Sequence, residues 1–310
     1  MRLRLGTRGS ALALAQSGTV ARALEGLGAE VELVRIETAG DADQARPFAE
    51  IGEPGVFVRA LERALADGRI DLAVHSYKDL PSRSPSELAV AAAPERADPR
   101  DRLLVRASAF EAGAPALPLA DGARVGTSSA RRAALLRDLR PDLATLLLRG
   151  NVDTRLAKVE RGDYDAILLA AAGLDRLAAG GGALPSPALR AVDLDPARFV
   201  PAPAQGALAL QVRAADRATA ELVARLDHAP THRAVRAERH LLALVEAGCQ
   251  APFGAFARPA AGAGDLELFA VLERDGRLLR ARAAGAEPEA LARANFEALL
   301  AEGAARSRGR

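Results

Sequence analysis

The chain has 310 residues, which is enough for two or three domains of ordinary size. Hydrophobic residues make up 49% and charged residues 26%, which excludes a disordered chain, and the net charge of +2 does not indicate a nucleic-acid binder. The longest uncharged apolar run, 166–174, is about half of the roughly 18 to 20 residues that span a bilayer, so the sequence does not indicate a membrane protein.

The first third of the chain alternates short apolar runs with helical patterns. This alternation is typical of βαβ units around a largely parallel sheet. The predicted elements are, in order, strand 3–5, a helix capped by Ser10, strand 29–36, a mobile loop over 39–55, helix 56–66, strand 70–74 and the polar turn 75–81.

A second run of the same kind follows the charged, Pro-containing segment 94–102. Its predicted elements are strand 124–126, helix 129–140, strand 143–148, helix 152–161 and strand 166–172, and strand 207–212 could return to the first half. Beyond it we predict helices 218–226 and 232–245, a small antiparallel sheet within 266–280 and a closing helix 289–302. The fold class is therefore α/β, with two similar βαβ domains and a smaller α+β domain at the C-terminal end.

Arginine is concentrated in the second run. Segment 124–161 carries nine basic and four acidic residues, and only Lys78 and Lys158 in the whole chain are lysines. Two successive strand-to-helix corners present cations, which are Arg131 and Arg132 after Ser129, then Arg149 and Arg155. In a doubly wound sheet these corners face one crevice, and arginine binds carboxylates with two parallel hydrogen bonds. A small polycarboxylate is therefore a natural ligand, although a serine cap followed by solvated arginines is the alternative, and phosphate is the competing ligand.

Asp79 follows Lys78 in the turn after a buried strand. It could be the one carboxylate in a cationic cleft, where it would stabilise a positively charged intermediate. The alternative is that the Lys78-Asp79 pair is an ordinary exposed turn.

The only cysteine, Cys249, lies in a loop flanked by Gly248 and Pro252. One cysteine excludes an internal disulfide and a multi-cysteine metal site, and it suits a reducing compartment, so we expect a cytosolic protein. The loop favours an accessible thiol over a buried one. The histidines lack a third ligand at a metal-binding spacing, so we interpret His228, His232 and His240 as structural, His75 as a turn residue, and expect no metal.

Six motifs in order resemble those of the porphobilinogen deaminase (hydroxymethylbilane synthase) family. They lie at 5–13, 75–81, 126–132, 148–156, 201–206 and 238–254 and cover nearly the whole chain. The sequence differs from the usual family pattern in the mobile loop, where Glu53 and Pro54 replace Gly-Lys, and at Ala204, where the family usually has glycine.

The resemblance implies a transferase of tetrapyrrole and haem biosynthesis that joins four porphobilinogen molecules into hydroxymethylbilane. It implies two lobes like those of periplasmic binding proteins around a cleft, with domains 1–98 plus 204–217, 99–203 and 218–310. Cys249 would hold a dipyrromethane cofactor through a thioether, and Asp79 would be the catalytic residue. The cofactor-binding residues would be Cys249, Lys78, Ser129, Arg131 and Arg132, and the substrate-binding residues Arg8, Ser10, Arg149, Arg155 and Gln205.

For partners, the resemblance implies a small-molecule substrate, no nucleic acid, no membrane and a monomer. Two alternatives remain open. Two βαβ lobes around a cleft also suit a solute-binding module that captures a carboxylate without chemistry. A family member without turnover is the second alternative, for which Pro54 in the loop is the support.

Overall fold

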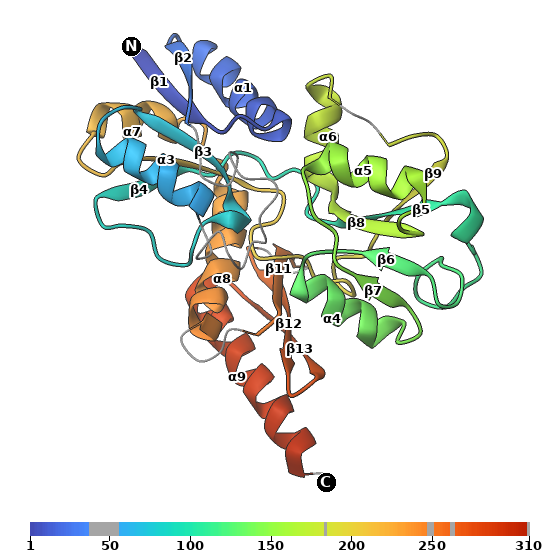
Figure 1. The fold of residues 1–310 in the computed structure, drawn as a ribbon. Coiled ribbons are helices and arrows are strands. Elements are labelled where there is room, and N and C mark those ends of the chain that lie inside the picture. The colour runs from blue at the N-terminus through green and yellow to red at the C-terminus, as the bar shows by residue number, and fades with distance from the viewer. Residues whose placement is uncertain (37–55, 183–184, 247–250, 261–263, 309–310) are drawn as a thin grey trace. The chain divides into compact units, whose positions relative to one another are not determined.

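The computed structural model describes residues 1–36, 56–182, 185–246, 251–260 and 264–308. They form two compact units, each built from three stretches of chain and shown in Figure 1. Unit 1 comprises Met1–Ala97, Asp175–Gly182 and Gly206–His232, and unit 2 comprises Asp98–Leu174, Ala183–Gln205 and Arg233–Arg310.

Unit 1 contains a five-stranded sheet in the order β2-β1-β3-β10-β4. Strands β1, β2 and β3 are parallel, whereas β10 is antiparallel to both of its neighbours, β3 and β4. The strands are β1 (Arg2–Thr7), β2 (Glu30–Arg35), β3 (Leu72–Ser76), β4 (Leu88–Ala92) and β10 (Leu208–Arg213). The helices of this unit are α1 (Ala11–Glu25), α3 (Val56–Ala66) and α7 (Arg217–Ala224).

This sheet has a separate hydrophobic core on each face, and alternate side chains of β3 belong to one core or the other. Leu72 and Val74 pack with Val20 and Leu24 of α1, whereas Ala73 packs with Leu61 and other apolar residues of α3. Because successive side chains of a strand point to opposite faces, β3 contributes apolar side chains both to the core with α1 and to the core with α3. Ser10 caps α1, and its side chain accepts a hydrogen bond from Ala13 N.

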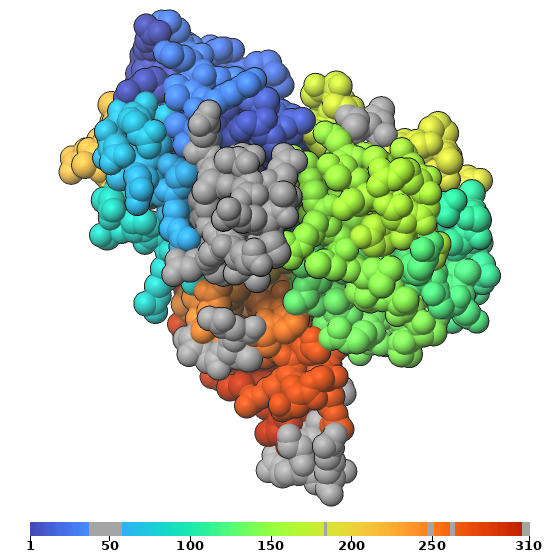
Figure 2. Space-filling view, viewed as in Figure 1, coloured from blue at the N-terminus to red at the C-terminus, as the bar shows by residue number. Residues whose placement is uncertain are grey.

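Unit 2 contains a second five-stranded sheet, in the order β7-β6-β8-β5-β9. Strands β6, β7 and β8 are parallel, and β5 is antiparallel to β8 and β9. The strands are β5 (Asp101–Arg106), β6 (Arg124–Gly126), β7 (Ala144–Leu146), β8 (Ala166–Ala170) and β9 (Leu189–Asp193). The helices α4 (Ala130–Leu139), α5 (Val152–Arg161) and α6 (Ala171–Ala179) follow β6, β7 and β8, and α4 and α5 lie in the green part of Figure 2.

The C-terminal part of unit 2 is an antiparallel sheet with two long helices beside it (Figure 1). Its elements are α8 (Ala229–Glu246), β11 (Phe253–Pro259), β12 (Leu266–Arg274), β13 (Arg277–Gly285) and α9 (Pro288–Arg308). Alternate residues of β12 again divide between two cores. Leu268 and Ala270 pack with α8 and α9, whereas Phe269 and Val271 join the core around Leu135 of α4.

The α/β class and the small C-terminal sheet are confirmed, and the predicted helices 56–66 and 152–161 have the observed bounds. The sheets are largely parallel, as predicted, and in each of them one interior strand, β10 or β5, runs antiparallel to its neighbours. The predicted mobile loop 39–55 lies outside the described residues. The three predicted domains with their boundaries stay a prediction.

Candidate functional site

The first group of candidate residues surrounds a small pocket in unit 1, at the carboxyl ends of β1 and β3. The pocket has a volume of about 100 Å³, and Arg8, Ser10 and Asp79 all line it. Arg8 follows β1, Ser10 begins α1, and Asp79 ends the short 3₁₀ turn Tyr77–Asp79 that follows β3. The parallel pairing of β1 with β3 brings these three side chains together, as expected for residues at the same edge of a parallel sheet.

The carboxyl of Asp79 lies beside two cations. The surrounding protein desolvates its carboxyl and raises the pKa of Asp79, while the charges of Lys78 and Arg8 oppose this rise. The carboxylate of Asp79 lines the same pocket as Arg8 and Ser10, and its role as the catalytic residue stays a prediction.

His75 is not a turn residue, so that interpretation is wrong. It is a buried residue of β3, 5% exposed, and its Nε2 lies 2.9 Å from Gln211 Oε1. Gln211 in turn donates from Nε2 to Glu62 Oε1 at 3.1 Å. The acceptor Glu62 fixes the orientation of the Gln211 amide, so His75 must donate through Nε2. Burial lowers the pKa of His75 to about 4, against the hydrogen bond with Gln211, so the ring is neutral at pH 7.

The second group of candidate residues lies in unit 2, where β6 leads into α4. Ser129 caps α4 and accepts a hydrogen bond from Arg132 N at 3.4 Å. Arg131 and Arg132 are only 6% and 7% exposed, and both bind the fully buried carboxylate of Asp101. Asp101 could not be singled out from the sequence, because it is one of several charged residues in segment 94–102.

Arg155 lies in the first turn of α5, at the corner that follows β7. Its Nε donates to Gly150 O at 2.8 Å. Burial lowers the pKa of Arg155, and the positive charge of Arg132 lowers it further, which indicates that the two predicted arginine corners act on one another. Arg149 is half-buried at the same corner, and its carbonyl oxygen accepts a hydrogen bond from Lys158 Nζ at 3.1 Å.

Gln205 lies beside the arginine pair rather than at a corner of the sheet. It is 1% exposed and donates from Nε2 to Asp101 Oδ1 at 3.1 Å and to Pro99 O at 2.9 Å. In unit 2 the structure thus brings Gln205 together with Arg131 and Arg132 through Asp101.

Arg140, which follows α4, is buried rather than placed on an outer helix face. Its side chain is 4% exposed and binds Asp142, with Nε to Oδ1 at 2.8 Å and Nη2 to Oδ2 at 2.7 Å. It also donates to the carbonyl oxygens of Leu117 and Leu119. These partners are all supplied by residues of unit 2, so Arg140 holds the end of α4 in place.

Arg176 is a half-buried cation that the sequence analysis missed. It lies on α6, and burial lowers its pKa to about 10, against the charge of Asp175. Its Nη2 donates to Gly206 O at 2.7 Å within unit 1. The signal was present, because α6 follows β8 just as the other arginine-bearing helices follow β6 and β7.

Cys249 lies outside the described residues, which resume two positions later. Both flanks of its loop are described, since α8 ends at Glu246 and β11 begins at Phe253. Buried Glu238 of α8 accepts hydrogen bonds from Ala257 N of β11 at 2.7 Å and from Ala204 N at 2.5 Å. The two flanks of the cysteine loop are therefore tied to one another and to the segment that carries Gln205.

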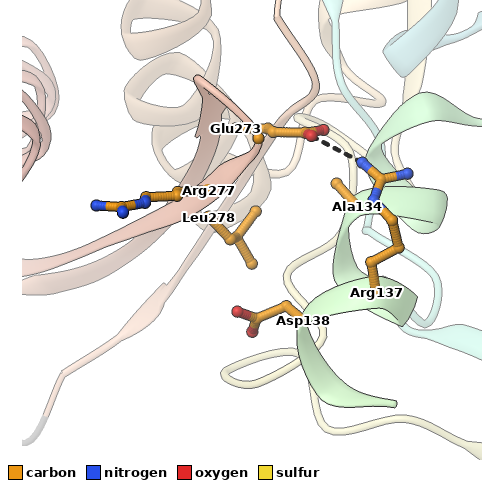
Figure 3. Close-up of a pocket in the computed structure, with 7 residues that line it drawn as sticks. Ala134, Arg137, Asp138, Glu273, Arg277 and Leu278 are labelled. Carbon is orange, nitrogen blue, oxygen red and sulfur yellow. Dashed lines mark hydrogen bonds and ion pairs between the residues drawn. The ribbon is translucent and has the colours of Figure 1, made fainter. Parts of the chain in front are cut away.

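A larger groove of about 590 Å³ lies in unit 2 between α4 and the β12–β13 hairpin. Figure 3 shows Arg137 and Glu273 facing one another across it, and their ion pair measures 2.7 Å. Asp138 pairs with Arg280, also at 2.7 Å. The lining carries two positive charges, from Arg137 and Arg277, and two negative charges, from Asp138 and Glu273, so it has no excess of cations for a polycarboxylate, and it includes none of the predicted site residues.

Within the described parts of the chain, no group of three His, Cys, Asp or Glu side chains is placed to hold a metal ion. No helix there has the length and apolar character needed to cross a membrane.

Comparisons with solved structures give only distant similarity. A Salmonella typhimurium periplasmic binding protein with high arginine specificity is 11% identical, covers 73% of this chain and 91% of its own, and has a TM-score of 0.41. A Brucella ovis periplasmic binding protein with bound glutathione is 16% identical, covers 79% and 69%, and has the same TM-score of 0.41.

Comparisons with sequences give much closer similarity. The model of "Porphobilinogen deaminase, dipyromethane cofactor binding domain" matches residues 3–221, and that of "Porphobilinogen deaminase, C-terminal domain" matches 232–300. A porphobilinogen deaminase of Sphingopyxis alaskensis is 49% identical over 82% of this chain and 79% of its own. One of Roseiflexus sp. is 44% identical over 96% of both chains. Because the first family model spans more than half of the sequence and these relatives align along most of it, the chain belongs to the porphobilinogen deaminase family.

Proposed function

We propose that this chain joins four porphobilinogen molecules head to tail on a dipyrromethane cofactor held by Cys249, and that water then releases hydroxymethylbilane. The single observation that carries the proposal is the buried Arg131–Arg132–Asp101 cluster, which keeps an unsatisfied donor beside an excess of positive charge. Membership of the family indicates porphobilinogen as the substrate, and the cluster offers positive charge and a hydrogen-bond donor to carboxylates such as those of porphobilinogen.

The donor set fits the carboxylates of the cofactor. Arg131 Nε is buried and, within the described structure, has no hydrogen-bond partner. A bound carboxylate oxygen would satisfy it, and an unsatisfied buried donor costs about 1 to 3 kcal/mol. The cofactor supplies the attachment point for the growing chain. Its carboxylates would be held by the residues Lys78, Ser129, Arg131 and Arg132.

Asp79 is the proposed catalytic residue. Loss of ammonia from the substrate and attack by a pyrrole ring place positive charge on ring nitrogens, which a fixed carboxylate would stabilise. Arg8, Ser10, Arg149, Arg155 and Gln205 are the proposed substrate-binding residues. Each porphobilinogen brings two carboxylates, so a lengthening chain needs several fixed cations.

The chain is further proposed to work as a monomer in the cytosol, on a small molecule and without nucleic acid. The support is the modest net charge of +2, the confinement of basic excess to one segment, and a single cysteine that suits a reducing compartment.

The mass of the intact purified chain tests the proposal. We expect an excess equal to two linked pyrroles, and we expect Cys249→Ser to fold, to lack this excess and to give no red colour with acidic dimethylaminobenzaldehyde. Normal loading and turnover in Cys249→Ser would contradict the proposal. A wild-type chain that binds porphobilinogen but never gains covalent mass would favour the solute-binding alternative.

A further inference from the structure

Asp101 is the fully buried carboxylate of the arginine cluster, and the proposed mechanism gives it no role of its own. We propose that Asp101 is a positioning residue, which orients Arg131 and Arg132 and sets their combined charge so that they can bind a carboxylate of the cofactor. The inference rests on the proposed function of these two arginines.

The contacts of Asp101 reach both arginines at once. Its Oδ2 accepts from Arg131 Nη1 at 2.8 Å, and its Oδ1 accepts from Arg132 Nε at 2.9 Å and Nη2 at 2.6 Å. Gln205 Nε2 donates the fourth hydrogen bond to this carboxylate, and it is the third that Oδ1 accepts. The carboxylate is 0% exposed, so protein donors rather than water satisfy it. Among the described residues, Asp101 is the one acidic side chain that bonds to either arginine.

The remaining contacts fix the plane of each guanidinium group. Arg131 Nη1 also donates to Val200 O at 2.7 Å, and Arg132 Nη1 donates to Leu168 O at 2.9 Å. A guanidinium group is a rigid planar fork, so two acceptors on one nitrogen set the direction of the others. Asp101 and Val200 O therefore determine where the unsatisfied Nε of Arg131 points.

Asp101 also sets the charge of the cluster. Burial lowers the pKa of Arg131, the charge of Arg132 lowers it further, and Asp101 opposes both effects. Burial would raise the pKa of Asp101, but the two arginines hold it well below its ordinary value. The three ions sum to one positive charge, which a single ligand carboxylate neutralises. Without Asp101, two adjacent buried cations would repel one another.

The experiment measures how fast apo-protein gains covalent cofactor when mixed with porphobilinogen, by intact mass over time. We expect folded Asp101→Asn to load roughly 100-fold more slowly than wild type, since misplacement of about 1 Å costs that much. The matched control is Asp142→Asn, which removes the main partner of buried Arg140 at the other end of α4. It should lower the melting temperature but leave the loading rate within about twofold of wild type.

Asp101→Glu separates the effect of the carboxylate's position from the effect of its charge. It also tests the inference if Asp101→Asn does not fold. It retains the negative charge but moves the carboxylate by one methylene, so it should load faster than Asp101→Asn and clearly more slowly than wild type. Loading at the wild-type rate by folded Asp101→Asn or by Asp101→Glu would overturn the inference. An equal loss in Asp142→Asn would also overturn it.

Arg131→Gln distinguishes this inference from the proposed function on which it rests. If Arg131→Gln loads and turns over normally, the proposed role of the arginine pair fails, whatever Asp101→Asn does. If Arg131→Gln loads slowly while folded Asp101→Asn loads normally, the proposed role of Arg131 stands and only the positioning role of Asp101 fails.

Discussion

Asp79 lines the pocket of unit 1 and has a raised pKa, and both properties bear on catalysis. If its negative charge stabilises cationic pyrrole nitrogens, Asp79→Asn keeps the shape but loses the charge, and turnover should fall about 10²- to 10³-fold. Asp79→Glu keeps the charge and should retain more activity. The measurement is porphobilinogen turnover by both variants, with cofactor occupancy checked by mass.

The pH dependence of turnover provides the control for the role of the Asp79 carboxylate. Wild-type turnover should fall as acid protonates the carboxylate, at a pH above the ordinary value for aspartate because the pKa is raised. Asp79→Asn should lack this acid limb. A loaded Asp79→Asn protein that turns over at the wild-type rate would show that Asp79 is only a turn residue.

Ala204 is a buried alanine with φ of 60°, in the left-handed region that favours glycine. Relief of this strain by Ala204→Gly is worth about 1 to 2 kcal/mol and offsets the loss of a buried methyl group, about 0.8 kcal/mol. We expect Ala204→Gly to leave the free energy of unfolding unchanged or slightly higher. Denaturant unfolding provides the measurement.

The matched control for Ala204 is Ala209→Gly, at another fully buried alanine, in β10. Ala209 lies in extended backbone, so glycine there relieves no strain and should cost roughly 1 to 2 kcal/mol. Equal losses at both positions would mean that the φ of Ala204 carries no cost.

For single residues, the sequence predicts which side chains lie at the ends of strands better than it predicts which groups they contact. Asp79, Arg131 and Arg155 stand at strand ends, and local patterns place them there. The burial of Arg140 and the partner of His75 could not be predicted in the same way, because Leu117 O, Leu119 O and the side chain of Gln211 come from other parts of the chain. Whether a charged side chain is solvated or buried depends on tertiary packing, which spacing along one helix does not encode.

Among the elements, β11 depends on the close approach of Gly254 to another segment. A Cβ there would lie 2.8 Å from Val200 O and 2.9 Å from Pro201 O, both backbone atoms. Gly254→Ala should therefore lower the free energy of unfolding by about 1 to 3 kcal/mol. Because Val200 O also binds Arg131, slower cofactor loading should accompany the loss.

Gly285→Ala in β13 is the control, since the nearest side-chain atom, Leu291 Cδ1, would be 4.0 Å from the new Cβ. It should be neutral or slightly stabilising, because alanine reduces the freedom of the unfolded chain. Thermal melts and loading rates of both variants check the pair. If Gly254→Ala melts like Gly285→Ala, the contact with Val200 and Pro201 is not tight.

The elements that could be predicted were those with a periodic pattern of apolar residues or with a residue that marks the end of a helix. Helix 56–66 has an apolar face and helix 152–161 ends at Gly162 in a left-handed conformation, so both bounds could be predicted. The strands β4, β5 and β9 were missed because they are short and find their partners far away in the sequence. The boundary between β8 and α6 falls within the alanine run 170–172, which carries no glycine or proline, so the predicted strand continued two residues too far.

For the whole molecule, acid should reduce stability in two stages. The folded pKa of His75 lies near 4 and the unfolded value near 6.5, so between these values the unfolded chain binds more protons. Stability is therefore lost as pH falls through this window, by about 3 kcal/mol from His75 alone. His75→Asn should abolish this first stage.

The second stage involves carboxylates whose folded pKa is depressed. Burial would raise the pKa of Asp71, but hydrogen bonds from Arg4 and Arg213 lower it to about 2. The pKa of Asp101 is depressed as well. Such groups stabilise the fold above their unfolded pKa and lose that contribution below about pH 4. Melting temperatures at pH 7, 5 and 3 test both stages, and parallel curves for wild type and His75→Asn would contradict the first.

Strand β10 lies between β3 and β4 in the sheet of unit 1, although the whole of 93–207 separates it from β4 in the chain. During synthesis, β3 emerges long before its antiparallel neighbour, and β4 has no strand to pair with until β10 arrives. The residues of the second βαβ run leave the ribosome in that interval. The order of translation therefore favours completion of the arginine-bearing sheet before the sheet that holds Asp79, so a ribosome-stalled chain ending before Leu208 should expose the edge of β3 to chaperones and proteases.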